Sequence, residues 1–204
     1  MLLTNALYFI IVDKDIKNKI LEEFKNEVTS KLPQGNSIHW ESALNYDTLG
    51  NLKYLSMVLN ETLRIRPSAH FSFMYEMTEK IEVSGYTILP NHPILISIYL
   101  LHHNKDEWKD HDRFIPERFD PNSEYYLTPS GKRRSPFSYG PFLGGKRICI
   151  GKTFAENLVR CVLSIIVSQL DFEFVDKSLY EKRPVNNFAN IEPTINVKVK
   201  IHDS

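Results

Sequence analysis

Apolar residues recur at helical spacing in several segments of the chain. Residues 2–12 are apolar almost all round, which is typical of the buried end of a longer helix. A second helix is predicted to run to about residue 29, because Asp13 is suited to cap it and apolar residues follow at helical intervals. Two further helices are predicted over 51–65 and 151–170.

Shorter apolar runs with aromatic and β-branched residues indicate strands. These runs cover residues 70–77, 81–89, 94–99, 172–175 and 195–201. Residues 102–145 differ, because they are rich in Pro, Asp, Asn, Ser and Gly and show no sustained period. An irregular segment of that length inside a compact domain is usually functional. The sequence therefore predicts a mainly α-helical α+β fold with small β-sheets and one long irregular segment.

Composition narrows the possible functions only a little. The apolar fraction of 42% indicates a folded domain, and 25 basic residues balance 25 acidic ones. Nucleic acid is therefore not an expected partner, and no apolar run reaches the roughly 20 residues of a membrane span. Two cysteines are too few for a disulfide framework and suggest a reducing compartment. Cys161, on the apolar side of its predicted helix, is expected to be a small core residue.

The other cysteine, Cys149, ends a glycine-rich segment directly before the last predicted helix. The positive end of a helix favours a thiolate, and Arg147 adds positive charge suited to a carboxylate. Phe142 is placed to lay its ring beside a ligand. Three glycines are expected to let the backbone turn tightly and approach a flat ligand: Gly144, Gly145 and Gly151. A lone cysteine in such a turn is more often simply buried, so the whole string matters more than the thiol.

The string Phe142-x-x-Gly145-x-Arg147-x-Cys149-x-Gly151 resembles the haem-binding signature of cytochromes P450. The resemblance implies that Cys149 binds the iron of haem b (iron protoporphyrin IX) as a thiolate. It also implies that Arg147 contacts a haem propionate and that Phe142 packs beside the proximal ligand. The implied activity is a monooxygenase that inserts one oxygen atom of O₂ into a small apolar substrate. The implied partner is an electron-donating reductase or a ferredoxin-type protein.

Two upstream motifs follow in the order of the same family. Glu61-x-x-Arg64 resembles its E-x-x-R motif, and Trp108 with the segment 114–119 resembles its W-x-D-P and P-E-R-F region. His111 stands where the family often has an acidic residue. The resemblance implies that Arg118 reaches back to Glu61 and Arg64, and that these three charges form a structural triad away from water.

Several histidines and aromatic residues leave alternatives open. By resemblance, the segment after Pro67 passes beside the substrate pocket, so four residues are candidate pocket or propionate contacts: Ala69, His70, Phe71 and Phe73. Filling a sheet core is an equally good explanation for these aromatics. Three histidines suggest a metal site, but they are expected to face solvent because nothing completes a ligand set: His102, His103 and His111.

The resemblance covers nearly the entire chain and implies that residues 1–204 are the C-terminal, haem-binding portion of a P450 domain. The acidic–Thr pair of the family's distal helix would then lie before Met1. A membrane anchor would lie further upstream, at the endoplasmic reticulum if the full-length protein is of the anchored eukaryotic type. Without the remainder of the domain, apolar residues of the first helix are expected to be exposed: Leu2, Leu3, Leu7, Phe9 and Ile10.

The sequence is compatible with three hypotheses about function. The first is the monooxygenase, with Lys146 and Lys152 either docking an acidic redox partner or serving as ordinary surface lysines. The second is a truncated haem-binding or inactive fragment without turnover. The third is a cysteine-nucleophile hydrolase, which needs a histidine base near Cys149.

Overall fold

The structure is a computed structural model that describes residues 1–31, 43–178 and 196–201. It confirms a mainly helical domain with small antiparallel sheets. Its α-helices are α1 (Leu2–Val12), α2 (Lys14–Glu27), α4 (Tyr46–Asn51), α5 (Lys53–Ile65), α6 (Ile98–His102) and α7 (Lys152–Gln169). Short 3₁₀ turns are η1 (Thr29–Lys31), η2 (Pro116–Phe119), η3 (Glu124–Tyr126), η4 (Pro136–Ser138) and η5 (Gly145–Arg147).

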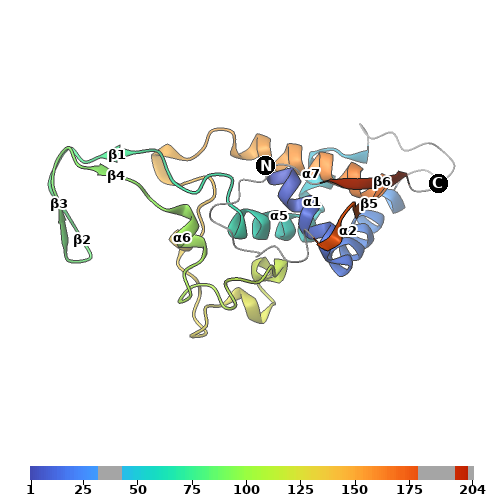
Figure 1. The fold of residues 1–204 in the computed structure, drawn as a ribbon, viewed down its shortest axis with the longest axis horizontal. Coiled ribbons are helices and arrows are strands. Elements are labelled where there is room, and N and C mark those ends of the chain that lie inside the picture. Colours follow the sequence, from blue (N-terminus) through green and yellow to red (C-terminus); the bar gives the residue numbers. More distant parts are fainter. Residues whose placement is uncertain (32–42, 179–195, 202–204) are drawn as a thin grey trace.

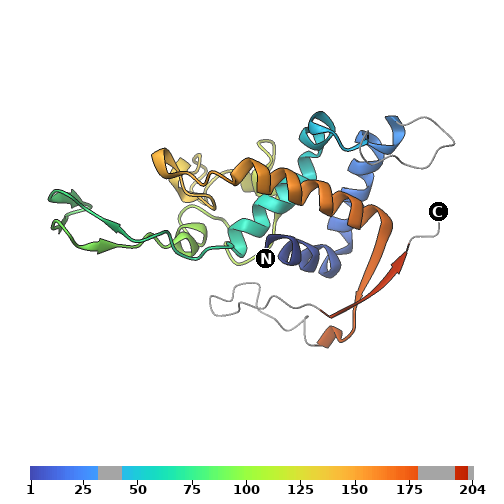
Figure 2. The ribbon, with the colours of Figure 1, turned by 90° about the horizontal axis from the view of Figure 1, so that it is seen from above.

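Six short strands form two-stranded antiparallel sheets. The strands are β1 (Tyr75–Glu76), β2 (Ile81–Val83), β3 (Tyr86–Ile88), β4 (Pro93–Ile94), β5 (Leu170–Phe174) and β6 (Val197–Ile201). β1 pairs with β4, β2 with β3, and β5 with β6. The hairpin of β2 and β3 lies at the far end of the molecule from α2 and the β5–β6 pair (Figure 1). Seen from above, α5 and α7 cross in the helical body (Figure 2).

The main core lies where α1, α2, α4, α5 and α7 meet. Its buried members include Ile10 of α1, Phe24 of α2, Leu55 of α5 and Val167 of α7. Cys161 packs against this cluster, as the helical pattern predicted. Each helix contributes one apolar stripe, so burial of these stripes against one another provides the main driving force for folding.

The expected exposure of the first helix is wrong for Phe9 and Ile10. These side chains are 4% and 3% exposed, whereas the other three, Leu2, Leu3 and Leu7, are partly buried. The ring of Phe9 stacks on Phe114, with the ring centroids 3.9 Å apart. Later segments of the same chain thus cover α1, which the pattern of α1 alone could not reveal.

Local polar residues decide where several elements begin. The predicted Asp13 cap is confirmed, because its Oδ1 accepts hydrogen bonds from the N–H groups of Asp15 and Ile16. The predicted strand over 94–99 is wrong at its end: Ser97 Oγ accepts a hydrogen bond from Leu100 N–H, and α6 begins at Ile98. The predicted strand over 70–77 shrinks to β1.

Two more predicted boundaries differ from the structure. The helix predicted over 51–65 is present as α5, which begins at Lys53. Leu52, with φ −75° and ψ 74°, separates it from the short helix α4. The predicted closing strands over 172–175 and 195–201 are present as β5 and β6, and residue 195 lies outside the described residues. The antiparallel pairing aligns Phe172 with Val199.

The N-terminus of α5 is capped from another helix. Its own flanking residue, Leu52, supplies no side-chain cap. Glu23 of α2 accepts hydrogen bonds from the N–H groups of Tyr54 (2.6 Å) and Leu55 (2.9 Å) instead. Burial raises the pKa of Glu23, and the hydrogen bonds from α5 oppose that shift. A carboxylate there stabilises both free N–H groups and the positive end of the helix.

Replacement of Glu23 by Ala is expected to lower the free energy of unfolding by about 1–2 kcal/mol, since two helix N–H groups lose their acceptor. Thermal or urea unfolding of the two proteins measures the difference. Glu22→Ala, an exposed neighbour on the same helix, serves as the control and is expected to change stability little. Equal losses in both variants would contradict the capping role.

Candidate functional site

A pocket of about 660 Å³ separates the segment around Phe71 from the loop that carries Cys149. Its walls are mostly apolar, and its lining residues include Phe71, Phe73, Ile98, Phe142 and Ile150. Cys149 is an exposed free cysteine at this pocket. A concave apolar site with a few polar groups is the usual form of a ligand or cofactor site.

Backbone hydrogen bonds close the loop that carries Cys149. The N–H of Cys149 donates to the carbonyl of Phe142 at 2.9 Å, and the N–H of Ile148 donates to the carbonyl of Gly145 at 3.3 Å. The carbonyl of Cys149 accepts from the N–H of Lys152, where α7 begins. The thiol therefore lies on a short, internally bonded loop directly before a helix, as the sequence predicted.

The tight turn of this loop requires a glycine at one position only. Gly145 has φ +64°, in the left-handed region, and Leu143 adopts φ +60° there as well. The turn does not need a glycine at the other two positions, because Gly144 and Gly151 have φ −157° and −83°. Any residue adopts those angles. A Cβ on Gly151 would lie 3.9 Å from Cys149 Sγ, at ordinary van der Waals distance.

Gly145→Ala is expected to lower the free energy of unfolding by about 1–2 kcal/mol, because an L-residue is strained in the left-handed region. Gly144→Ala is the matched control. A Cβ added at either glycine would meet no neighbouring atom within 4 Å, so crowding is equal and only the sign of φ differs. Unfolding curves of the two variants measure the contrast, and equal stability would contradict the argument.

The structure brings together some of the residues that the sequence singled out. Phe142, Arg147 and Cys149 line the pocket, and so do Ala69, Phe71 and Phe73. His70 is not among the described residues that line it. The ring of His70 lies beside Tyr99 at 5.9 Å between centroids, and its carbonyl accepts from the N–H of Ile98.

Two features of the pocket surface favour the binding of a ligand. First, large apolar side chains face the open space: Ile150 is 102% exposed and Phe73 is 80% exposed. Second, the exposed guanidinium of Arg147 makes no hydrogen bond or ion pair with any described residue. A flat apolar group that carries carboxylates would satisfy both features, since it would cover the apolar surface and pair with the cation.

The expectation that His102 faces solvent is wrong. Its side chain is fully buried (0% exposed) and His103 is half-buried. The Nδ1 atom of His111 is buried and has no hydrogen-bond partner among the described residues. Within the described ranges, no group of three or more His, Cys, Asp or Glu residues is placed to hold a metal ion. The part of the chain that the structure describes also holds no helix long and apolar enough to cross a bilayer.

Glu61, Arg64 and Arg118 form a fully buried charged cluster. Arg64 contacts both carboxylate oxygens of Glu61 at 2.8 Å, and Arg118 Nε donates to Glu61 Oε1 at 3.1 Å. All three side chains are 0% exposed. Burial lowers the pKa of Arg118, and the charge of Glu61 opposes that shift. One carboxylate thus faces two guanidinium groups in the interior.

Backbone carbonyls of the long irregular segment accept the remaining N–H groups. Arg64 donates to the carbonyls of His102 and His111 at 2.9 Å, and Arg118 donates to that of Asp110. The cluster therefore fastens the irregular segment to α5, which explains how a stretch without regular structure keeps one conformation.

Sequence reasoning missed Arg134, which extends this cluster. Arg134 donates to the carbonyls of Arg118 and Tyr125. Its guanidinium lies 4.4 Å from the ring centroid of Trp108, and that of Arg64 lies 5.2 Å from it. Trp108 is 1% exposed, so both cation–π contacts are shielded from water. A basic residue in a polar loop carries no sequence signal for such a contact.

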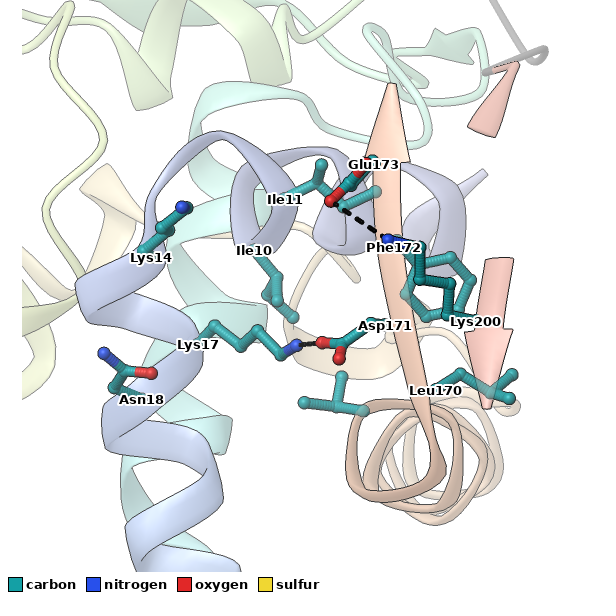
Figure 3. A pocket seen from close by; sticks show the side chains of 11 residues that line it. Ile10, Ile11, Lys14, Lys17, Asn18, Leu170, Asp171, Phe172, Glu173 and Lys200 are labelled. Carbon is teal, nitrogen blue, oxygen red and sulfur yellow. Dashed lines mark hydrogen bonds and ion pairs between the residues drawn. The ribbon is translucent and has the colours of Figure 1, made fainter. Parts of the chain in front are cut away.

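A second, smaller pocket of about 330 Å³ lies between α2 and β5 (Figure 3). Charged side chains line it in opposite pairs: Lys17 with Asp171, and Lys200 with Glu173. Figure 3 shows Lys17 of α2 reaching Asp171 of β5, whereas Lys200 and Glu173 lie on the paired strands β6 and β5. Because these charges satisfy one another, this pocket is explained by the docking of the β5–β6 pair on the helical body.

Comparison with known proteins identifies the family to which the chain belongs. The model of the family described as "Cytochrome P450" matches residues 1–199. The chain is 29% identical over 181 residues to Cytochrome P450 71B9 of Arabidopsis thaliana, covering 89% of this chain and 33% of that relative. It is 31% identical over 171 residues to Cytochrome P450 3A2 of Rattus norvegicus, covering 84% and 30%.

A third relative is the Steroid 17-alpha-hydroxylase/17,20 lyase of Mesocricetus auratus, 28% identical over 170 residues, covering 82% of this chain and 30% of that protein. The chain belongs to the cytochrome P450 family. It spans about a third of the length of the curated relatives it matches.

Proposed function

We propose that these residues form the haem-binding part of a cytochrome P450 domain, with the Cys149 thiolate as the axial ligand of haem b. The observation that carries the proposal is the exposed Cys149 thiol in an open, mostly apolar pocket beside Arg147, whose guanidinium has no partner among the described residues. In the complete protein, the proposed activity is a monooxygenase. Bound haem would supply the activation of O₂ through an iron held by a thiolate.

The residues of the site fit that cofactor. The pocket volume of about 660 Å³ is large, and its apolar walls suit a flat macrocycle. Arg147 is placed to pair with a propionate, because its guanidinium has no partner among the described residues. Phe142 lines the pocket beside the cysteine and would limit the access of water to the sulfur.

The pocket and the lysines near it indicate the kind of substrate and the kind of electron donor. Phe71, Phe73 and Ile98 line the same pocket and would favour a small apolar substrate. Lys146 is exposed and Lys152 is half-exposed, near the Cys149 loop. We assign both to an acidic reductase or ferredoxin-type partner, because neither makes an ion pair with a described residue. For the full-length protein we propose the endoplasmic reticulum membrane, if it is of the anchored eukaryotic type.

An absorption spectrum tests the proposal. The full-length protein, expressed with haem, reduced and exposed to carbon monoxide, is expected to show a strongly red-shifted Soret band. Cys149→Ala is expected to lose that band entirely, because no other thiol faces the pocket in the described part of the chain. Cys161→Ala is the control and should keep the band, since Cys161 packs in the core.

The results of these experiments distinguish the three hypotheses about function. A protein that binds haem through Cys149 but oxidises no substrate is a haem-binding protein without turnover. A haem-free protein that hydrolyses esters and loses that activity on Cys149→Ser would be a hydrolase. The structure supports the hydrolase poorly, because no histidine is among the described residues that line the pocket at Cys149. A red-shifted band retained in Cys149→Ala would refute the proposed ligand.

A further inference from the structure

His102 occupies a fully buried position between α5 and the loop that carries Cys149. The N–H of Gly140 donates to His102 Nε2 at 3.0 Å. His102 Nδ1 lies 3.2 Å from the carbonyl oxygen of Leu63, on α5. A backbone N–H can only donate and a carbonyl can only accept. His102 is therefore a neutral imidazole whose proton lies on Nδ1.

These two hydrogen bonds join distant parts of the chain. Leu63 lies in the last turn of α5, beside the buried Glu61–Arg64 pair. Gly140 lies at the start of the Cys149 loop, and its carbonyl accepts from the N–H of Leu143 at 3.0 Å. The carbonyl of Phe142, two residues beyond Gly140, accepts from the N–H of Cys149. One imidazole thus bridges the charged cluster and the loop.

Tyr139 makes a second attachment beside the first. Its ring stacks on that of His102, with centroids 5.1 Å apart. Its hydroxyl lies 3.1 Å from both the backbone carbonyl and the side-chain oxygen of Asn60, to which it donates. Asn60 is on α5, directly before Glu61. Burial raises the pKa of Tyr139 well above its usual value, so the hydroxyl stays a donor.

The surroundings keep His102 in the neutral form that the bridge needs. Its backbone carbonyl accepts from Arg64, and the positive charge of Arg64 faces the ring. His103 is the other titratable neighbour that disfavours the imidazolium. Burial, the largest cause, and these charges together lower the pKa of His102 to about 3.

We propose that His102, supported by Tyr139, is a positioning residue that fixes the start of the Cys149 loop on α5 and thereby sets the place of the Cys149 sulfur in the pocket. The effect on the haem rests on the proposed function. The fastening of the loop itself does not, because it depends only on contacts within the chain.

Amide hydrogen exchange of the full-length protein tests the fastening. His102→Phe keeps an aromatic ring and removes both hydrogen bonds. The peptide over residues 139–150 is expected to exchange at least about tenfold faster, the size expected when a buried hydrogen bond is lost. His102→Gln, whose amide supplies both a donor and an acceptor, is expected to restore most of the protection. Glu23→Ala is the stability-matched control, since it weakens α5 far from this loop.

The spectrum of the haem-loaded protein gives a second readout. In His102→Phe, the fraction of the reduced carbon monoxide complex that shows the red-shifted Soret band is expected to fall at least about twofold, from the loss of buried hydrogen bonds. His102→Gln and Glu23→Ala are expected to keep the wild-type fraction. This pattern distinguishes a displaced ligand from a general loss of stability, which would affect Glu23→Ala as well.

The proposal is overturned if a folded His102→Phe variant exchanges over 139–150 at the wild-type rate, or if Glu23→Ala accelerates exchange there equally. If His102→Phe does not fold, Tyr139→Phe replaces it, because that change removes only the hydroxyl contacts with Asn60. Its accelerated exchange supports the proposal and its unchanged exchange refutes it. If the wild type binds no haem, the proposed function fails, and the exchange experiment still decides the fastening.

Discussion

Glu61→Gln is expected to lower the free energy of unfolding by about 3–5 kcal/mol, which leaves the protein largely unfolded at ordinary temperature. The substitution keeps the size of the side chain but removes the carboxylate of Glu61, which pairs with Arg64 and Arg118. Both guanidinium groups are 0% exposed, so water cannot replace the lost charge. Urea or thermal unfolding, or the soluble yield if folding fails outright, measures the effect.

A surface pair of similar geometry provides the control. Glu124 contacts Lys109 at 2.7 Å, but the Glu124 side chain is 72% exposed. Glu124→Gln is therefore expected to change stability little, because solvent screens the pair. If Glu61→Gln were equally mild, the backbone carbonyls around Arg64 and Arg118 would be sufficient to hold both charges. The cluster would then be a hydrogen-bond network in which the ion pair contributes little.

The free energy of unfolding is expected to decrease as the pH falls, because of His102. Burial and the nearby charge of Arg64 lower its pKa to about 3 from 6.5. As the pH falls through about 6.5, the unfolded chain binds a proton at His102 and the folded chain does not. Protonation therefore stabilises the unfolded state. The contribution of His102 to stability is fully present above the pKa that His102 has in the unfolded chain, and it is lost as the pH falls toward the pKa that His102 has in the folded chain. The expected loss is about 2 kcal/mol between about pH 7.5 and pH 5.

The matched variant for this measurement is His102→Gln, which does not titrate. Its free energy of unfolding, measured by urea unfolding over the same pH range, is expected to lack that part of the slope. The other histidines and the carboxyl groups titrate in both proteins, so their contributions cancel in the comparison. Parallel curves for the two proteins would show that His102 takes up its proton in the folded state as readily as in the unfolded one.

The difference between predicted and observed elements follows from the range of the interactions. Helices α1, α2 and α7 depend on apolar stripes and near neighbours, and their ends agree with the pattern to within a few residues. The cap at Asp13 is equally local, since its partners are Asp15 and Ile16. The ends of α5 agree equally well, but the acceptor at its N-terminus is Glu23 of another helix, and no pattern within α5 indicates that contact.

The burial of the histidines also depends on contacts between residues distant in sequence, which the local sequence pattern does not reveal. Adjacent polar residues such as His102 and His103 in an irregular segment suggest a solvated loop. Burial of His102 depends on Leu63 and Gly140, which are 39 and 38 residues away along the chain. The exposure expected for Phe9 failed for the same reason, because its cover comes from Phe114.

The sequence by itself determined the family, the helical character and the residues that carry the proposed chemistry. Fixed residue types at fixed spacing around Cys149 suffice to propose the ligand loop from the sequence alone, because they lie within one short segment. Only the tertiary structure revealed the distant contacts around that loop: His102 accepts from the N–H of Gly140, and Tyr139 donates to Asn60 of α5. It also placed Arg134 beside Arg118 and Trp108 in the charged cluster. Their partners are distant in sequence, and a buried polar group takes its role from the partner that folding brings to it.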